Sequence, residues 1–244
     1  MCTIGVRRLG DNDYVVFKNK DFPRPGFEDR IVTEPGVFGV RGVATWSQSD
    51  AAEDEFSGLS IGANAAGLLC ADANVHGAAN QSNYDELVEI ALRAGGGVAD
   101  GIAAIEAACA VRPYLWGNIV MIDAVGAAAV EVRDKSVAVT PVKGPTARSN
   151  HHLLLNRPGD AAGSPTTEQR LAAAQRRVRE AEALDGILRL QRAHDDGETG
   201  ICNHEVSQTV YSYALRRQGD STRLYVTQGH PCQAEESVEL LVPF

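Results

Sequence analysis

The sequence of 244 residues has little of what marks several large protein classes. Its 23 basic residues are outnumbered by 32 acidic ones, and a net charge of −9 argues against nucleic-acid binding, which needs a basic surface. No apolar run approaches the roughly 20 residues that span a bilayer, so no membrane partner is expected. The N-terminus also lacks the basic segment and apolar core of a secretory signal peptide, which favours a cytoplasmic location.

Cysteine is also scarce, because only five are spread through the chain. An odd, scattered set predicts reduced thiols rather than a disulfide framework. The metal-binding spacings CxxC and HExxH are absent, so a zinc site built from Cys202, His204, His151 and His152 is only a rival hypothesis. The sequence predicts neither a metal nor an organic cofactor.

The composition that remains is that of a globular protein, with 44% hydrophobic and 23% charged residues. We expect a single domain over residues 1–244. Short β-rich runs bounded by turn residues predict several hairpins, the first joining residues 2–9 to residues 14–17. About three helices are predicted, over residues 84–94, 98–111 and 165–192. Strands and helices occur in blocks, so the fold class is α+β with antiparallel sheets.

Some segments carry more local expectations. Residues 23–36 contain prolines and glycines and are predicted to form a loop. The acidic residues 47–55 are expected in an exposed loop that could overhang a pocket and favour a cationic amide. In the helix predicted over residues 165–192, Gly186 is expected to interrupt the helix, and most charged side chains, including Arg170, are expected to face solvent.

Cys2 is the strongest candidate for chemistry. Removal of Met1 would leave Cys2 with both a thiol and a free α-amine, which together form a nucleophile with its own base. The usual pKa of an α-amine is roughly 7.7–8.0 and that of a thiol about 8.5, so the proton can pass between them near neutral pH. The opening hairpin is expected to return Asp21 beside Cys2, where its carboxylate could orient the ammonium group.

Further segments follow Cys2 in an order that resembles a known family. They are Lys18-Asn19-Lys20-Asp21, residues 62–68, Asn74, residues 117–123, Ser149-Asn150-His151 and residues 224–232. Together they resemble the N-terminal-nucleophile hydrolases of linear amides. This group includes penicillin V acylase, bile salt hydrolase and the acyl-CoA:isopenicillin N acyltransferase-like proteins.

The chain departs from the family pattern at three points. Lys18 stands where the bile salt group has arginine, and lysine lacks the planar fork of a guanidinium. Cys202-Asn203-His204 stands where the acyltransferase-like group often has Cys-Arg-His. A later arginine on which the bile salt group relies has no assigned counterpart here.

The resemblance implies a four-layer αββα sandwich and a role for each matching residue. Cys2 would attack an amide carbonyl and form a thioester. The side-chain amide of Asn150 and a group at Asn74 would donate hydrogen bonds to the oxyanion. Asp21 would position the ammonium group and raise its pKa. Lys18 would lower the pKa of the thiol.

Hydrolysis of a small linear amide is therefore the first functional hypothesis. Transfer of the acyl group from the same thioester to an amine is the alternative, which the similarity of residues 224–232 to the acyltransferase-like group favours. A binding protein that has lost activity on the same fold is a third hypothesis.

Glutamine amidotransferase domains also start Met-Cys, but they continue with glycine where this chain has Thr3. A further Met-Cys group of unknown function, with an Asn-Arg-Asp-Glu motif, resembles residues 18–22 and would share the fold. Oligomerisation is left open.

Overall fold

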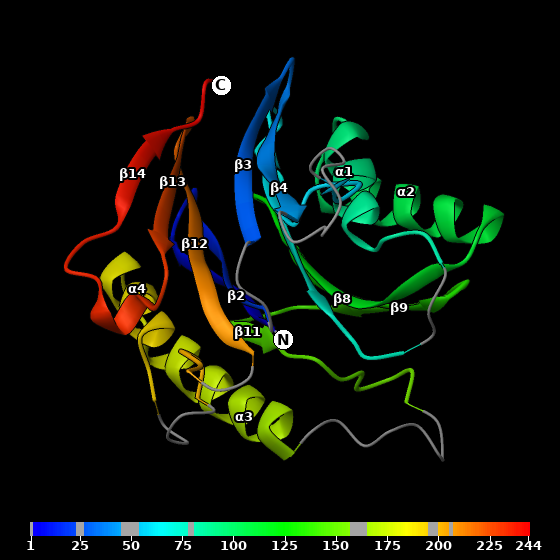
Figure 1. Ribbon diagram of the computed structural model, residues 1–244. Coiled ribbons are helices and arrows are strands. Elements are labelled where there is room, and N and C mark those ends of the chain that lie inside the picture. The colour runs from blue at the N-terminus through cyan, green and yellow to red at the C-terminus, as the bar shows by residue number, and fades with distance from the viewer. Residues whose placement is uncertain are drawn as a thin grey trace.

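The structure is a computed structural model that describes residues 2–22, 27–44, 54–77, 81–156, 165–194, 200–204 and 207–244. Two antiparallel sheets pack face to face, with α1 (Asp85–Arg93) and α2 (Val98–Val111) on one outer side. The other outer side carries α3 (Pro165–Glu180) and α4 (Leu184–Gln191), as Figure 1 shows. The predicted α+β fold with four αββα layers is confirmed. Among the described residues, no helix is long and apolar enough to cross a bilayer.

The six-stranded sheet carries the N-terminal hairpin in its interior. Its strand order is β11-β1-β2-β12-β13-β14, and Cys2 pairs with Lys20 across the hairpin. The strands are β1 (Cys2–Gly10), β2 (Asp13–Phe22), β11 (Thr146–Arg148), β12 (Gln208–Gln218), β13 (Ser221–Gln228) and β14 (Val238–Leu241). The predicted opening hairpin is therefore present and lies between neighbouring strands on both sides.

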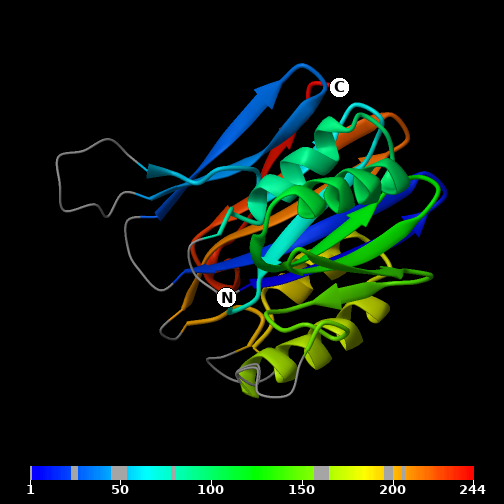
Figure 2. The same ribbon diagram turned by 90° about the vertical axis from the view of Figure 1, so that its right-hand side faces the viewer.

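The second sheet has the order β10-β9-β8-β7-β6-β4-β3, and β5 (Asp54–Glu55) pairs with β4. The other strands are β3 (Phe27–Glu34), β4 (Val37–Ala44), β6 (Ile61–Asn64), β7 (Leu69–Asn74), β8 (Tyr114–Ile122), β9 (Ala127–Asp134) and β10 (Ser136–Pro141). The loop predicted over residues 23–36 was wrong for Phe27–Glu34, which form strand β3. Residues 35–36 form the turn after it, and residues 23–26 lie outside the described residues. Figure 2 shows the β3–β4 hairpin along the edge of the molecule. Residues 47–53 of the predicted acidic loop lie outside the described residues, and its last two residues, Asp54 and Glu55, form strand β5 instead.

Alternation along β2 determines which layer each side chain reaches. Val16 belongs to the apolar core between the sheets, whereas Val15 and Phe17 pack against α3 and α4. Successive strand residues point to opposite faces. Lys18 therefore points toward the second sheet, and Asp21 points toward the helices.

The helix predicted over residues 165–192 is in fact two helices. The break falls at residues 181–183, where Ala183 is extended with φ −143° and ψ 172°. Gly186 lies inside α4, so its predicted role as the helix breaker was wrong. A Cβ atom at Gly186 would lie 2.9 Å from the Cβ of Ala181, so this glycine allows α4 to pack against the turn before it.

Replacing Gly58 with alanine is expected to be strongly destabilising. Gly58 has φ +95°, and a Cβ atom there would clash with the backbone of Asp85 and Glu86 at the start of α1. The left-handed backbone and the overpacking together should lower the free energy of unfolding by about 2–5 kcal/mol. Gly36 is a matched control, because it has φ +74° but open space around it. Urea unfolding should show a clearly smaller loss for Gly36→Ala, and equal losses would contradict the packing argument.

Candidate active site

Cys2 begins β1 in the buried interior of the six-stranded sheet. Its nitrogen donates a hydrogen bond to Oδ1 of Asn150 at 2.9 Å, although 148 positions separate the two residues. The pairing of β1 with β11 explains this contact, because the register of Ile4 with Arg148 brings the segment after β11 to the start of β1. The sheet thus joins two of the residues that the sequence singled out.

Asn150 links Cys2 to two further groups. Its Oδ1 also accepts a hydrogen bond from Nη2 of Arg170 at 2.9 Å, and its Nδ2 donates to the main-chain oxygen of Asn74 at 2.6 Å. Asn118 fixes this segment by donating to the main-chain oxygens of Ser149 and His151 at 2.7 and 2.9 Å. Asn74 and Asn150 are therefore adjacent, and their role as oxyanion donors stays a prediction.

Asp21 lies near the end of β2 and is buried on the helix side of the sheet. Its Oδ2 accepts a hydrogen bond from Nη1 of Arg170 at 3.2 Å, and its Oδ1 accepts one from Oγ1 of Thr209 at 2.7 Å. Burial raises the pKa of Asp21, while the charge of Arg170 and the Thr209 hydrogen bond oppose this rise. Asp21 is thus connected to the Cys2 nitrogen through Arg170 and Asn150.

Arg170 is the main residue of this site that the sequence reasoning missed. It was predicted to face solvent, but its side chain is 0% exposed and forms an ion pair with Asp21. The sequence carried a signal for this burial, because Arg170 has helical spacing to Thr167, Leu171, Ala174 and Val178. In the structure all five residues are buried. An arginine within an otherwise buried stripe indicates a partner in the interior.

Lys18 lies on the opposite face of β2. Its Nζ donates to Oδ1 of Asp72 at 2.7 Å and to the main-chain oxygen of Ser60 at 3.1 Å. Burial alone would lower the pKa of Lys18, but the charges of Asp72, Cys2 and Asp85 raise it above the ordinary value. The ammonium group therefore stays charged near Cys2. Its pairing with Asp72 was not predicted.

Asp72 and Asp85 form a buried acidic pair beside Lys18. Burial raises the pKa of Asp72 well above its usual value, and the neighbouring Asp85 charge raises it further, against the effect of Lys18. Burial likewise raises the pKa of Asp85. Two carboxyls thus share one buried cation, so the folded state favours keeping a proton on the pair.

This acidic pair predicts a pH-dependent stability. Because the pKa values are raised on folding, the native state binds more protons, and stability is lost as the pH rises from about 4 through the folded pKa values. Asp85→Asn removes one carboxyl, so its free energy of unfolding should fall less than that of the wild type between about pH 5 and 8. Urea unfolding across this range measures the two slopes. Asp220→Asn is the control, because its side chain is fully exposed, and it should keep the wild-type dependence of the free energy of unfolding on pH. If Asp85→Asn also keeps that dependence, the acidic pair does not cause it.

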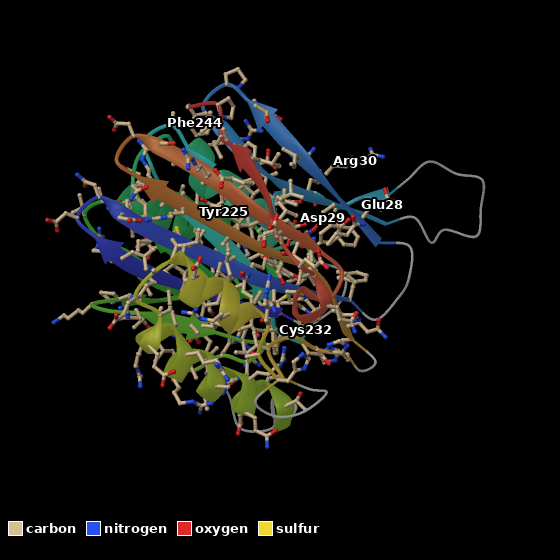
Figure 3. All side chains as sticks on the ribbon, turned by 90° about the vertical axis from the view of Figure 1, so that its left-hand side faces the viewer. Glu28, Asp29, Arg30, Tyr225, Cys232 and Phe244 are labelled. Carbon is tan, nitrogen blue, oxygen red and sulfur yellow. The ribbon has the colours of Figure 1, made fainter. Side chains whose placement is uncertain are left out.

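A second buried ion pair lies next to Cys2. Lys20, which pairs with Cys2 in the hairpin, donates from Nζ to Oδ1 of Asp29 at 2.6 Å. Asp29 also accepts a hydrogen bond from the hydroxyl of Tyr213. Figure 3 labels Asp29 together with its neighbours Glu28 and Arg30 on β3. Strand β3 is therefore connected through Asp29 to Lys20, the hairpin partner of Cys2.

The rival zinc set is not assembled as the sequence hypothesis required. Nδ1 of His151 lies 3.0 Å from Oγ1 of Thr167, and Nε2 of His152 lies 3.3 Å from the main-chain oxygen of Gly117. Cys202 and His204 form a separate pair, with Sγ and Nε2 3.6 Å apart. Within the described residues, His151 and His152 are therefore structural neighbours of the Asn150 segment.

Comparison with known proteins finds no matching family model and no matching curated protein. Several solved structures do match. A mutant conjugated bile acid hydrolase from Clostridium perfringens aligns with a TM-score of 0.62 and 13% sequence identity, and the alignment covers 99% of this chain and 92% of that protein. The Caenorhabditis elegans ortholog of N-acylethanolamine-hydrolyzing acid amidase has a TM-score of 0.58 at 9% identity, covering 99% and 100%. Penicillin V acylase from Agrobacterium tumefaciens has 0.55 at 11% identity, covering 93% and 83%. The chain therefore has the N-terminal-nucleophile hydrolase fold that its motifs predict.

Proposed function

We propose that the chain is a hydrolase of a small linear amide, with Cys2 as nucleophile after removal of Met1. The observation that carries this proposal is the buried network in which Cys2, Asn150, Arg170 and Asp21 follow one another through contacts of 2.9, 2.9 and 3.2 Å. The shared fold with three amide hydrolases supports it. All five cysteines are free thiols, which suits the cytoplasmic location that we also propose.

The chemistry begins at the two functional groups of Cys2. The α-amine accepts the thiol proton while Sγ attacks the amide carbonyl carbon. The tetrahedral intermediate collapses, the C–N bond breaks, and the ammonium group returns the proton to the leaving nitrogen. Water then attacks the thioester carbonyl with the α-amine as base, which releases the acid and restores the thiol. No oxidant or reductant is needed.

The surrounding residues stabilise the charges that develop. Oδ1 of Asn150 accepts a hydrogen bond from the Cys2 nitrogen and so fixes its orientation. The Asp21 carboxylate favours the ammonium form of the base, and the Lys18 ammonium favours the thiolate. One N–H of the Asn150 amide is engaged by Asn74, and we assign the second N–H, with a group at Asn74, to the oxyanion.

Acyl transfer is a second candidate. It uses the same thioester, with an amine in place of water in the second half of the reaction. The observation that favours it is the similarity of residues 224–232 to the acyltransferase-like proteins. A product assay with and without an added amine acceptor separates the two reactions, because only transfer gives a new amide.

Intact mass spectrometry tests the proposal as a whole. The purified chain should have the mass expected after loss of Met1, and incubation with a panel of small acyl amides should add one acyl group on Cys2. Peptide mapping then locates the adduct. If the chain loses Met1 but forms neither adduct nor product with any amide in the panel, the inactive binding protein becomes the better description.

A further inference from the structure

Four soft metal ligands converge on the side of the six-stranded sheet that α3 and α4 cover. His194 follows α4, Cys202 and His204 lie in residues 200–204, and Cys232 lies in the short turn η2 (Pro231–Gln233). One ligand atom from each residue lies within 4.8 Å of the other three. Figure 1 places the turn beside α4, and Figure 3 labels Cys232 there. Three segments that are separate in the sequence thus meet at one point.

The distances suit a tetrahedral ion. Nε2 of His204 lies 3.6 Å from Sγ of Cys202 and 3.2 Å from Sγ of Cys232. Zinc holds sulfur at about 2.3 Å and nitrogen at about 2.0–2.1 Å, so tetrahedral coordination separates these atoms by about 3.5 Å. Small side-chain adjustments are enough to bring all four ligands to one ion.

The donor set selects the kind of ion. Calcium and magnesium require oxygen ligands, whereas two sulfur and two imidazole nitrogen donors in a tetrahedron are typical of zinc. Two thiolates balance the charge of a divalent ion. Cys202 is buried, Cys232 and His204 are partly buried, and His194 is exposed, so an ion can enter from the His194 side.

Two neighbouring imidazole rings pack against His204. The ring of His230 stacks on that of His204 with centroids 3.9 Å apart and an interplanar angle of 18°. The ring of His194, itself a candidate ligand, also lies against His204, with the two centroids 4.9 Å apart. These ring contacts fix the plane of the His204 imidazole beside the two thiols.

We propose that His194, Cys202, His204 and Cys232 bind one zinc ion as a structural site. Two S–Zn bonds form as the two thiols release their protons to solvent, and each imidazole coordinates through a nitrogen lone pair. No group is oxidised or reduced. Four protein ligands leave no open position for a substrate, so the ion fastens the end of α4, residues 200–204 and the β13–β14 connection together.

The segment that this ion would hold also supports Asp21. The backbone N–H of Asn203 donates to Oγ1 of Thr209 at 2.9 Å, and that hydroxyl donates to Asp21 at 2.7 Å. Nδ2 of Asn19 donates to the main-chain oxygen of Ile201 at 2.9 Å. Loss of zinc should therefore loosen Asp21 and reduce amide cleavage. This consequence rests on the proposed function, whereas zinc binding does not.

Metal analysis of the full chain tests the site directly. After expression with zinc and dialysis against metal-free buffer, the wild type should contain about one zinc per chain. Cys202→Ser and Cys232→Ser should each lose at least about ten-fold in zinc content, since removal of a ligand opens the site. Cys109→Ala, on the buried face of α2, is the matched control and should keep its zinc. A zinc-free wild type, another metal in its place, or equal zinc in Cys202→Ser would overturn the proposal.

Measurements on the wild type remain informative if the serine variants fail to fold. Titration with a thiol-specific mercurial should release one zinc for every two thiols modified, which a metal-sensitive dye reports. Replacement of zinc by cobalt should give the visible absorption of a tetrahedral ion with sulfur ligands. An octahedral cobalt spectrum, or a reduced chain that takes up no zinc, would overturn the assignment. A Cys202–Cys232 disulfide that persists in protein supplied with zinc would do so too.

Discussion

Cys2→Ala is expected to lower the rate of amide cleavage by about 10⁴-fold or more, because it removes the nucleophile and leaves only binding and oxyanion contacts. The rate should be measured with the amide that gives the largest turnover in the wild type. Cys109→Ala is the matched control, since Cys109 is a buried core thiol outside the candidate site and should retain the wild-type rate.

A second variant, measured in the same assay, separates the thiol of Cys2 from its α-amine. A chain whose Cys2 nitrogen stays in an amide bond, through an extension that is not removed, keeps the thiol but loses the base. We expect it to be nearly as inactive as Cys2→Ala. Wild-type rates in Cys2→Ala on every amide would show that the reaction runs elsewhere. Full activity in the extended chain would assign the base to another group.

Arg170→Met is expected to lower the free energy of unfolding by about 3–5 kcal/mol, because it leaves the Asp21 carboxylate buried without its cation. Both side chains of this pair are 0% exposed, and Arg170 also holds Oδ1 of Asn150. Urea unfolding measures the loss. Arg216→Met is the control: its pair with Asp13 is partly exposed, at 24% and 14%, and should be worth about 0–1 kcal/mol.

A double variant decides whether the Arg170 effect is electrostatic. Asp21→Asn with Arg170→Met removes both charges and should recover part of the stability lost in Arg170→Met alone. If Arg170→Met is no more destabilising than Arg216→Met, or if the double variant recovers nothing, the buried pair does not carry the energy assigned to it.

Local patterns explain most of what the sequence predicted correctly. The opening hairpin and helix α2 follow from strand and helix periodicity, and α2 has the predicted bounds of Val98–Val111. Cys2, Asn74 and Asn150 lie together as the motif order implied. In contrast, β3 was missed because charged residues dominate it, so the flanking prolines and glycines gave the stronger signal.

What the sequence did not predict depends on partners that are distant in the chain. Arg170 is buried because Asp21 lies 149 positions away on the facing strand. The Asp72 and Asp85 pair meets Lys18 only when the two sheets pack. The proposed zinc ligands lack a compact spacing, since His194 and Cys232 come from different segments. Tertiary packing creates each of these contacts, and composition and periodicity do not encode it.

In the mechanism that we propose, the alternation along β2 means that the thiol and the nitrogen of Cys2 are contacted mainly from different layers. Lys18 reaches the thiol side from one face and depends on Asp72 of the second sheet. Asp21 and Arg170 reach the nitrogen side through Asn150 and depend on helix α3. Substitutions in β7 would therefore act on the thiol through Lys18. Substitutions at Arg170 in α3 would act on the nitrogen through Asn150 and also on the thiol, because the charges of Arg170 and Cys2 interact.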